Sequence, residues 1–118
     1  MSIETAIFDS LAALVGNRVF PDVAPYDSER PYITYQQIGG PATQCLDGTM
    51  LDKENCYVQI NVWADTRLSA TATAKAAESA LVGMPGIQTK VLSNRINDHD
   101  EDLNRYGTKQ DFSILVDR

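Results

Sequence analysis

Apolar residues recur at helical spacing near the start of the chain. The stripe consists of Ile3, Ile7, Leu11 and Leu14, widened by Phe8 and Val15. Ser2 precedes it as a predicted N-cap, and Glu4 lies in the first turn, where negative charge favours a helix. Residues 16–17 are Gly and Asn, which both tolerate the left-handed conformation that ends helices. The spacing therefore predicts an amphipathic helix that docks on a core.

Alternation and β-branched or aromatic composition predict several strands further along the chain. The segments are 32–38, 56–64, 87–92 and 110–116, with a short edge strand at 19–20 and a further strand at 42–46. Segment 56–64 has the clearest pattern. Its aliphatic face is Val58, Ile60 and Val62, and its polar face with aromatic ends is Tyr57, Gln59, Asn61 and Trp63. This asymmetry favours an antiparallel sheet that helices cover on one side only.

A second helix is predicted to begin after Asp65, its expected cap, and to end near residue 82. One helical stripe is Ala70, Ala74, Ala77 and Leu81, and a neighbouring stripe is Leu68, Ala72, Ala76 and Ala80. Stripes of alanine allow a helix to approach a sheet closely. Glycines and a proline at residues 83–86 end the helix and turn the chain.

The order of these elements indicates a fold class. A helix, two or three strands, a helix and two strands predict an α+β fold, with both helices packed on one face of a mostly antiparallel sheet of four to five strands. The length of 118 residues suits a single domain over residues 1–118. Residues 94–107 are predicted to form a long polar loop.

The acidic balance of the chain narrows its function classes. The formal net charge is -6, and 43% of the residues are hydrophobic, which is ordinary globular usage. A broad nucleic-acid footprint needs clustered Lys and Arg, so it is excluded. No apolar run approaches the roughly 20 residues that span a bilayer, and residues 1–10 lack the basic cluster of a signal peptide. Composition therefore predicts a soluble acidic protein without a membrane partner.

One cluster of acidic residues is a candidate for chemistry: Asp98, Asp100, Glu101 and Asp102. Alternating carboxylates suit Ca²⁺, but Leu103 and Lys109 stand where a calcium loop needs Gly and Glu. His99 is the single histidine, and a histidine without an identified nucleophile does not define a general base. We therefore expect a solvated loop and no enzyme activity. A small hydrolase or metal-dependent protein that uses His99 is the less favoured alternative.

The two cysteines, Cys45 and Cys56, indicate neither a metal site nor a secreted disulfide scaffold. A structural zinc site needs about four Cys or His ligands in close-spaced pairs, which this chain lacks. We expect two unpaired thiols, at least one of them partly buried, and no cofactor.

The uncharged face of segment 56–64 is a candidate interaction surface. Protein interfaces are enriched in Tyr and Trp and depleted in charge, as this face is. The candidate residues are Tyr57, Gln59, Asn61 and Trp63, together with the apolar Met50 and Leu51 just before the strand. Base stacking is not favoured, because segments 32–38 and 57–63 carry no Lys or Arg. An internal role, with the aromatic rings packed under loops, is an equal alternative.

Several phrases of the sequence occur in a familiar order. They are Val19-Phe20-Pro21-Asp22-Val23-Ala24-Pro25, Arg30-Pro31-Tyr32-Ile33-Thr34-Tyr35, Leu46-Asp47-Gly48 and Val58-Gln59-Ile60-Asn61-Val62-Trp63-Ala64, followed by the Ala-rich helix. In this order and spacing the chain resembles the small tail-completion proteins of long-tailed bacteriophages, also called tail terminators or head–tail joining proteins. The likeness runs from the first helix to the last strand.

The resemblance implies a structural virion protein with no catalytic residues to transfer. Members of that family form a ring, generally a hexamer, at the head-proximal end of the tail tube, where the ring stops tube growth and joins the head connector. The implied partners are further copies of the chain, the major tail tube protein and the head–tail connector or head-closure protein. The implied location is the tail or neck of the virion, after synthesis in the host bacterial cytoplasm.

DNA enters this interpretation only as passing cargo. Like charge discourages adsorption, so the acidic residues at 98, 100, 101 and 102 are candidates for the wall of the channel. Another neck or head-closure ring protein and a monomeric adaptor with one partner are the structural alternatives.

Overall fold

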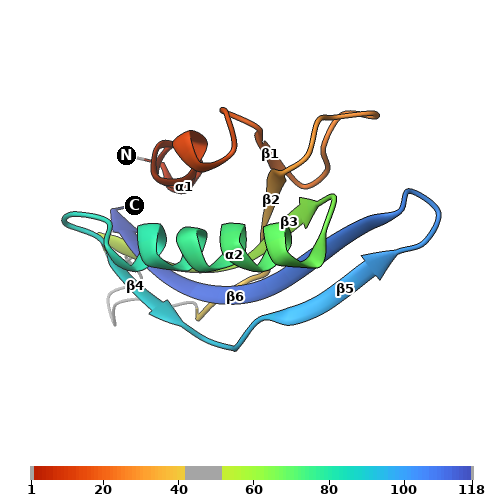
Figure 1. Ribbon diagram of the computed structural model, residues 1–118. Helices are drawn as coiled ribbons and strands as arrows, with labels where there is room; N and C mark the ends of the chain where they lie inside the picture. Colours follow the sequence, from red (N-terminus) through yellow and green to blue (C-terminus); the bar gives the residue numbers. More distant parts are fainter. Residues whose placement is uncertain (1, 42–51, 118) are drawn as a thin grey trace.

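The computed structural model describes residues 2–41 and 52–117, and it has an α+β fold (Figure 1). The helices are α1 (Ile3–Leu11), extended by one 3₁₀ turn (Ala12–Leu14), and α2 (Arg67–Val82). The strands are β1 (Val19–Pro21), β2 (Tyr32–Gln37), β3 (Lys53–Ala64), β4 (Gln88–Val91), β5 (Ile96–Asp100) and β6 (Arg105–Asp117). The predicted fold class is confirmed. Met50, Leu51, Cys45 and the predicted strand at 42–46 lie outside the described residues.

The six strands form one sheet in the order β1-β2-β3-β6-β4, and β5 pairs with the other half of β6. The pair β1–β2 is parallel, and the other pairs are antiparallel. β3 and β6 pair over most of their length, from Lys53 opposite Asp117 to Ala64 opposite Tyr106. Within the described residues, the strand that the sequence does not predict is β5.

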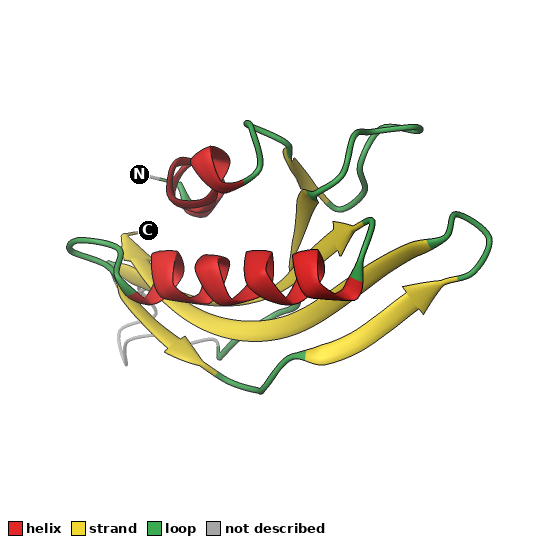
Figure 2. Cartoon of the chain, viewed as in Figure 1, coloured by secondary structure: helices red, strands yellow, loops and turns green. Residues whose placement is uncertain are grey.

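Both helices lie on one side of the sheet, and the core fills the space between (Figure 2). The alanine stripe of α2 is buried as predicted: Ala70, Ala74, Ala77 and Leu81. It faces the aliphatic face of β3 and the alternate residues Phe112, Ile114 and Val116 of β6. The neighbouring predicted stripe is wrong at its start, because Leu68 is 84% exposed. Ala80, at the end of that stripe, is partly buried against the core, and α1 packs against α2.

The N-cap of α1 is the predicted residue, whereas the N-cap of α2 lies one residue after the predicted one. The Ser2 hydroxyl accepts from the backbone N–H of Thr5, as an N-cap should. Asp65 does not cap α2. The cap is Thr66, whose hydroxyl accepts from the backbone N–H of Ser69, whereas Asp65 accepts from Arg30 at 2.7 Å.

The predicted loop over residues 94–107 is wrong. Residues Ile96–Asp100 form β5, which pairs with Arg105–Lys109 of β6 in a long hairpin at one end of the molecule (Figure 1). The acidic run is thus the second half of a strand and its turn. After Ile96, β5 lacks the β-branched and aromatic residues typical of strands, so pairing with β6, rather than its own propensity, holds it extended.

Candidate functional site: the open face of the sheet

The side of the sheet that faces away from the helices is called here the open face. Strand alternation and register place on it the predicted contact residues of β3 and the odd-numbered residues of β6. Its two regions differ in chemistry. The aromatic–arginine cluster comprises Phe20, Tyr32, Trp63, Asp100 and Arg105, and the amide ladder comprises Asn55, Gln59, Asn61, Asp111 and Ser113.

Trp63 is the centre of the aromatic–arginine cluster. It lies opposite Gly107 in the register, and its ring crosses that glycine so closely that an added Cβ would stand 2.6 Å from the indole. The Arg105 guanidinium lies 4.1 Å from a Trp63 ring centroid, a cation–π distance. The indole therefore lies against Gly107 and under the Arg105 guanidinium, and a side chain at position 107 would collide with it.

Arg105 connects this cluster to the hairpin turn. Its guanidinium donates to the Tyr32 hydroxyl and forms an ion pair with Asp100 at 3.0 Å. Tyr32 is buried and meets Phe20 edge-on at 6.2 Å. Backbone hydrogen bonding from Leu103, followed by the hydrogen bond and charge of Arg105, lowers the pKa of Asp100. Four elements of the fold thus meet at one guanidinium.

The amide ladder has a different character. Its side chains are half-exposed, except for the buried Ser113, and they hydrogen-bond to one another along β3 and between β3 and β6. The Gln59 amide donates to the Asp111 carboxylate at 3.3 Å, and the Asn61 amide donates to the Gln59 carbonyl oxygen at 3.4 Å. The Ser113 hydroxyl is 2.6 Å from the Asn55 oxygen. Such amides retain further donors and acceptors that point away from the sheet. The ladder is a flat polar surface with hydrogen-bonding capacity to spare.

The structure separates the predicted surface residues between these regions. Gln59 and Asn61 lie in the ladder beside the half-buried Tyr57, whereas Trp63 lies in the cluster. Sequence reasoning missed Arg105 and Gly107. The strand that carries both residues begins at residue 105, so the predicted strand at 110–116 is too short. Polar residues on both faces of residues 105–109 hide the alternation there.

The acidic residues of the hairpin do not form a catalytic site with His99. Alternation puts Asp98 and Asp100 on the open face, where they pair with Lys109 at 3.8 Å and with Arg105. His99 points to the opposite side and stacks on Tyr106 at 4.5 Å. The described residues contain no group of three or more His, Cys, Asp or Glu side chains placed to hold a metal ion.

Arg67 of α2 binds the β5–β6 hairpin on the side of the sheet that the helices cover. Its guanidinium donates to the carbonyl oxygens of Gly107 at 2.8 Å and Asp98 at 2.7 Å, and it lies over the Tyr106 ring. The β5–β6 hairpin is therefore held on both faces by arginines. Cys56 is fully buried in the core, as expected for at least one thiol, and its pairing with Cys45 is not tested.

A cavity of about 290 Å³ opens beside the aromatic–arginine cluster. Residues 22–28 of the β1–β2 link form one wall, Leu103 of the hairpin turn forms another, and Tyr32, Trp63 and Arg105 form the floor. Small-molecule pockets span roughly 300–1,000 Å³. This cavity is at the lower limit of that range, and its size suits a protein side chain better than a cofactor.

The fold is a small α+β module with a polar, hydrogen-bonded open face. Residues 8–117 match the family described as tail completion protein gp17, and the chain belongs to this family. It is a structural tail protein of the phage type. No helix among the described residues is long and apolar enough to cross a membrane.

Solved structures include a chain of similar fold. A chain in the virion of a native gene transfer agent particle matches with a TM-score of 0.66 and 21% identity, over 99% of this chain and 96% of that one. A protein from Akkermansia muciniphila has a TM-score of 0.47 and 11% identity, over 96% of this chain and 46% of that one, which does not establish a shared fold. A comparison with curated proteins found no match.

Proposed function

We propose that this protein caps the head-proximal end of a phage tail tube as a hexameric ring of identical subunits. The ring stops growth of the tube and joins the tail to the head. The observation that carries the proposal is the family match over residues 8–117. The fold it shares with a chain of a gene transfer agent virion agrees with a place in a virion.

The proposed partners are further copies of the chain, the major tail tube protein, and the head–tail connector or head-closure protein. The protein is made in the host bacterial cytoplasm and ends in the tail or neck of the virion. DNA passes through the ring as cargo. A chain of net charge -6 repels the phosphate backbone, so it does not hold the DNA in the passage.

We assign the contact with a neighbouring subunit or ring to the middle of the open face, from Tyr57 to Asn61. The β3 side chains of this region are uncharged, the charges beside them on β6 are Asp111 and Lys109, and its amides have donors and acceptors left over. Uncharged polar surfaces with an aromatic residue are typical of protein interfaces. Trp63 supports this surface from the side, and Met50 and Leu51 stay part of the proposal, although they lie outside the described residues.

We propose that the acidic residues of the hairpin lie at the channel wall: Asp98, Asp100, Glu101 and Asp102. Glu101 and Asp102 supply the net negative charge of this wall. Asp98 and Asp100 are paired with Lys109 and Arg105, whereas among the described residues neither Glu101 nor Asp102 has an ion-pair partner. The test is the double variant E101K/D102K. It should assemble into virions that deliver less DNA, because a cationic wall attracts phosphates. Unchanged DNA delivery would place these two residues elsewhere.

The experiment on the contact surface is Gln59→Arg, compared with Ala72→Arg on the exposed side of α2. Both variants add one positive charge at a surface position. A phage that lacks its own copy of the gene is supplied with each variant. Gln59→Arg should give overlong or headless tails by electron microscopy, whereas Ala72→Arg should give normal virions. Normal virions with Gln59→Arg would remove the open face from the interface.

A further inference from the structure

Six of the eleven large apolar side chains that are exposed in the described residues lie at two places on opposite edges of the sheet. One place, the acidic mouth, comprises Asp22, Val23, Tyr26, Asp27 and Leu103 around the 290 Å³ cavity. The other, the basic edge, comprises Lys90, Val91, Leu92, Arg95 and Ile96 at the end of β4 and the start of β5. Contiguous exposed apolar residues rimmed by polar ones mark interaction sites.

The apolar residues of the acidic mouth are strongly exposed. Val23 is 78% exposed and Tyr26 is 92% exposed, on a link whose inner side lines the cavity. The floor of the cavity is closed by Trp63 and Arg105, whose guanidinium is already engaged by Asp100 and Tyr32. The floor therefore offers an apolar ring and no unpaired positive charge. The charges at the rim are the carboxylates of Asp22 and Asp27 and the guanidinium of Arg30, which is paired with Asp65 at 2.7 Å.

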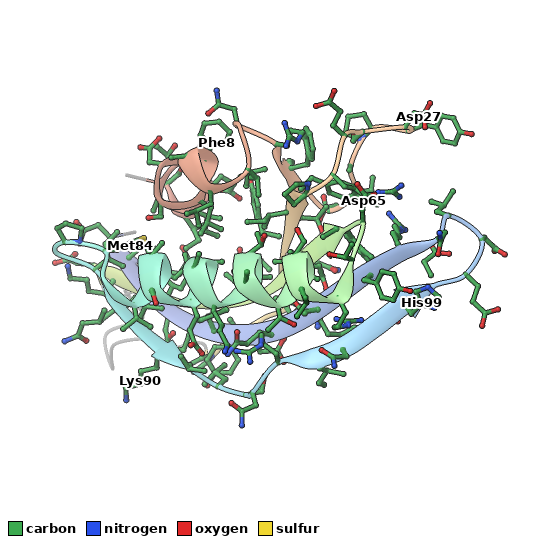
Figure 3. All side chains as sticks on the ribbon, in the orientation of Figure 1. Phe8, Asp27, Asp65, Met84, Lys90 and His99 are labelled. Carbon is green, nitrogen blue, oxygen red and sulfur yellow. The ribbon has the colours of Figure 1, made fainter. Side chains whose placement is uncertain are left out.

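The basic edge has the complementary composition. Val91, Leu92 and Ile96 are between 41% and 59% exposed, and Lys90 and Arg95 lie among them in the sequence. β4 and β5 are both outer strands of the sheet, so this edge has no strand beside it in the described residues. Figure 3 shows Lys90 at the lower left of the molecule and Asp27 at the upper right, far from each other.

We infer that the acidic mouth of one copy receives the basic edge of the next copy, which is the contact that links subunits side by side in the ring. The inference rests on the proposed function. The occupant is a second copy because the chain itself carries the matching partner: the carboxylates of Asp22 and Asp27 against two bases, and a cavity with the Trp63 ring in its floor against three aliphatic side chains. Leu92 or Ile96 of one copy fills the cavity of its neighbour, and Lys90 and Arg95 meet Asp22 and Asp27.

The same charges exclude a two-fold symmetric pairing through either patch. A symmetric contact would place Asp27 near the Asp27 of the second copy, or Lys90 near the Lys90 of the second copy. Like charges that face each other across an interface are unfavourable. A contact between two different patches is heterologous, and heterologous contacts close into rings when the rotation between subunits allows it. The amide ladder is then left for the ring that stacks above or below.

The first test is coupling of lysines to carboxylates with a zero-length carbodiimide reagent, on a mixture of ¹⁵N-labelled and unlabelled protein. The mixture is treated both as concentrated free protein and bound to purified tail tubes. Mass spectrometry should find mixed-label products that join Lys90 to Asp22 or Asp27. Inter-copy products that join other lysines, or no inter-copy product in either sample, would overturn the inference.

The second test uses charge exchange. K90E/R95E and D22K/D27K should each weaken self-association roughly tenfold or more, and the protein carrying all four changes should recover it, because the charges are then exchanged. Lys75→Glu on α2 is the control and should associate normally. Single-patch variants that associate like the wild type, or a folded four-change protein that does not recover, would contradict the contact.

These outcomes separate the contact from the proposed function. Wild-type protein that leaves tube ends bare yet gives the Lys90 products would remove the capping role and keep the contact. Conversely, K90E/R95E and D22K/D27K variants that cap tubes as rings would remove the contact and keep the capping role.

Discussion

The two regions of the open face, the aromatic–arginine cluster and the amide ladder, occupy equivalent strand positions but differ in how their side chains are engaged. In the aromatic–arginine cluster, Trp63, Arg105 and Tyr32 satisfy one another, so the most conspicuous side chains of the sheet hold the hairpin in place. In the amide ladder, Gln59 and Asn61 make long hydrogen bonds at half-exposed positions. The difference shows that the aromatic residue is engaged within the chain, and it is the reason for proposing the plain amides as the contact surface.

The largest expected effect is on the cluster. Trp63→Ala removes the indole from Gly107 and Arg105, and it should lower the free energy of unfolding by about 3 kcal/mol. Tyr57→Ala, on the same strand and face, is the matched control and should cost less than about 1 kcal/mol. Urea unfolding followed by circular dichroism measures both, since Trp63 is the single tryptophan. Equal losses would erase the distinction between the regions.

Gly107→Ala should have the next largest effect. The added Cβ meets the Trp63 ring at 2.6 Å, so the ring must move away from Arg105, at a cost of about 2 kcal/mol. In a Trp63→Ala background the same change should cost almost nothing, because the collision partner is absent. A double-mutant cycle gives the coupling energy directly, and additive losses would show that the two residues do not interact.

Asp100→Asn tests the ion pair that ends the cluster. The hydrogen bonds from Leu103 and the neighbouring Arg105 lower the pKa of Asp100 in the folded state. A lowered folded-state pKa gives stability that is present above the unfolded value of about 3.9 and is lost as pH falls through the folded value. The variant should therefore be less stable than wild type near pH 7, and the two should converge in acid. A difference that does not change with pH would contradict this origin.

Gln59→Arg should have the smallest effect on stability. The guanidinium can reach the Asp111 carboxylate that Gln59 now contacts, so the free energy of unfolding should change by less than about 0.5 kcal/mol. The same urea titration measures it. A loss as large as that of Trp63→Ala would mean that the ladder, too, is part of the internal support.

The sequence predicts most of the fold because its apolar periods are clear. The stripe that contains Ala70 and Leu81, the alternation of 56–64 and the Gly-Asn stop at 16–17, where both residues have positive φ, are all observed. β5 was missed because Asp98, His99 and Asp100 have low strand propensity. What makes this segment a strand is its pairing with Arg105–Lys109, which is a property of the folded chain and not of the segment.

The candidate site was predicted in part for a related reason. The face that carries Gln59 and Asn61 follows from alternation alone. The cluster does not, because it joins Tyr32, Trp63 and Arg105 across three strands, and only the register brings them together. The reason for a glycine at position 107 is clear only when Trp63 is known to lie opposite it.

The central claim is that this protein ends a tail tube, and electron microscopy of purified tail tubes incubated with the protein tests it most directly. The account predicts a single ring, made of copies of this chain, at one end of each tube, and tubes that no longer grow when tube protein is added. Bare tube ends, or rings along the tube wall with continued growth, would contradict it.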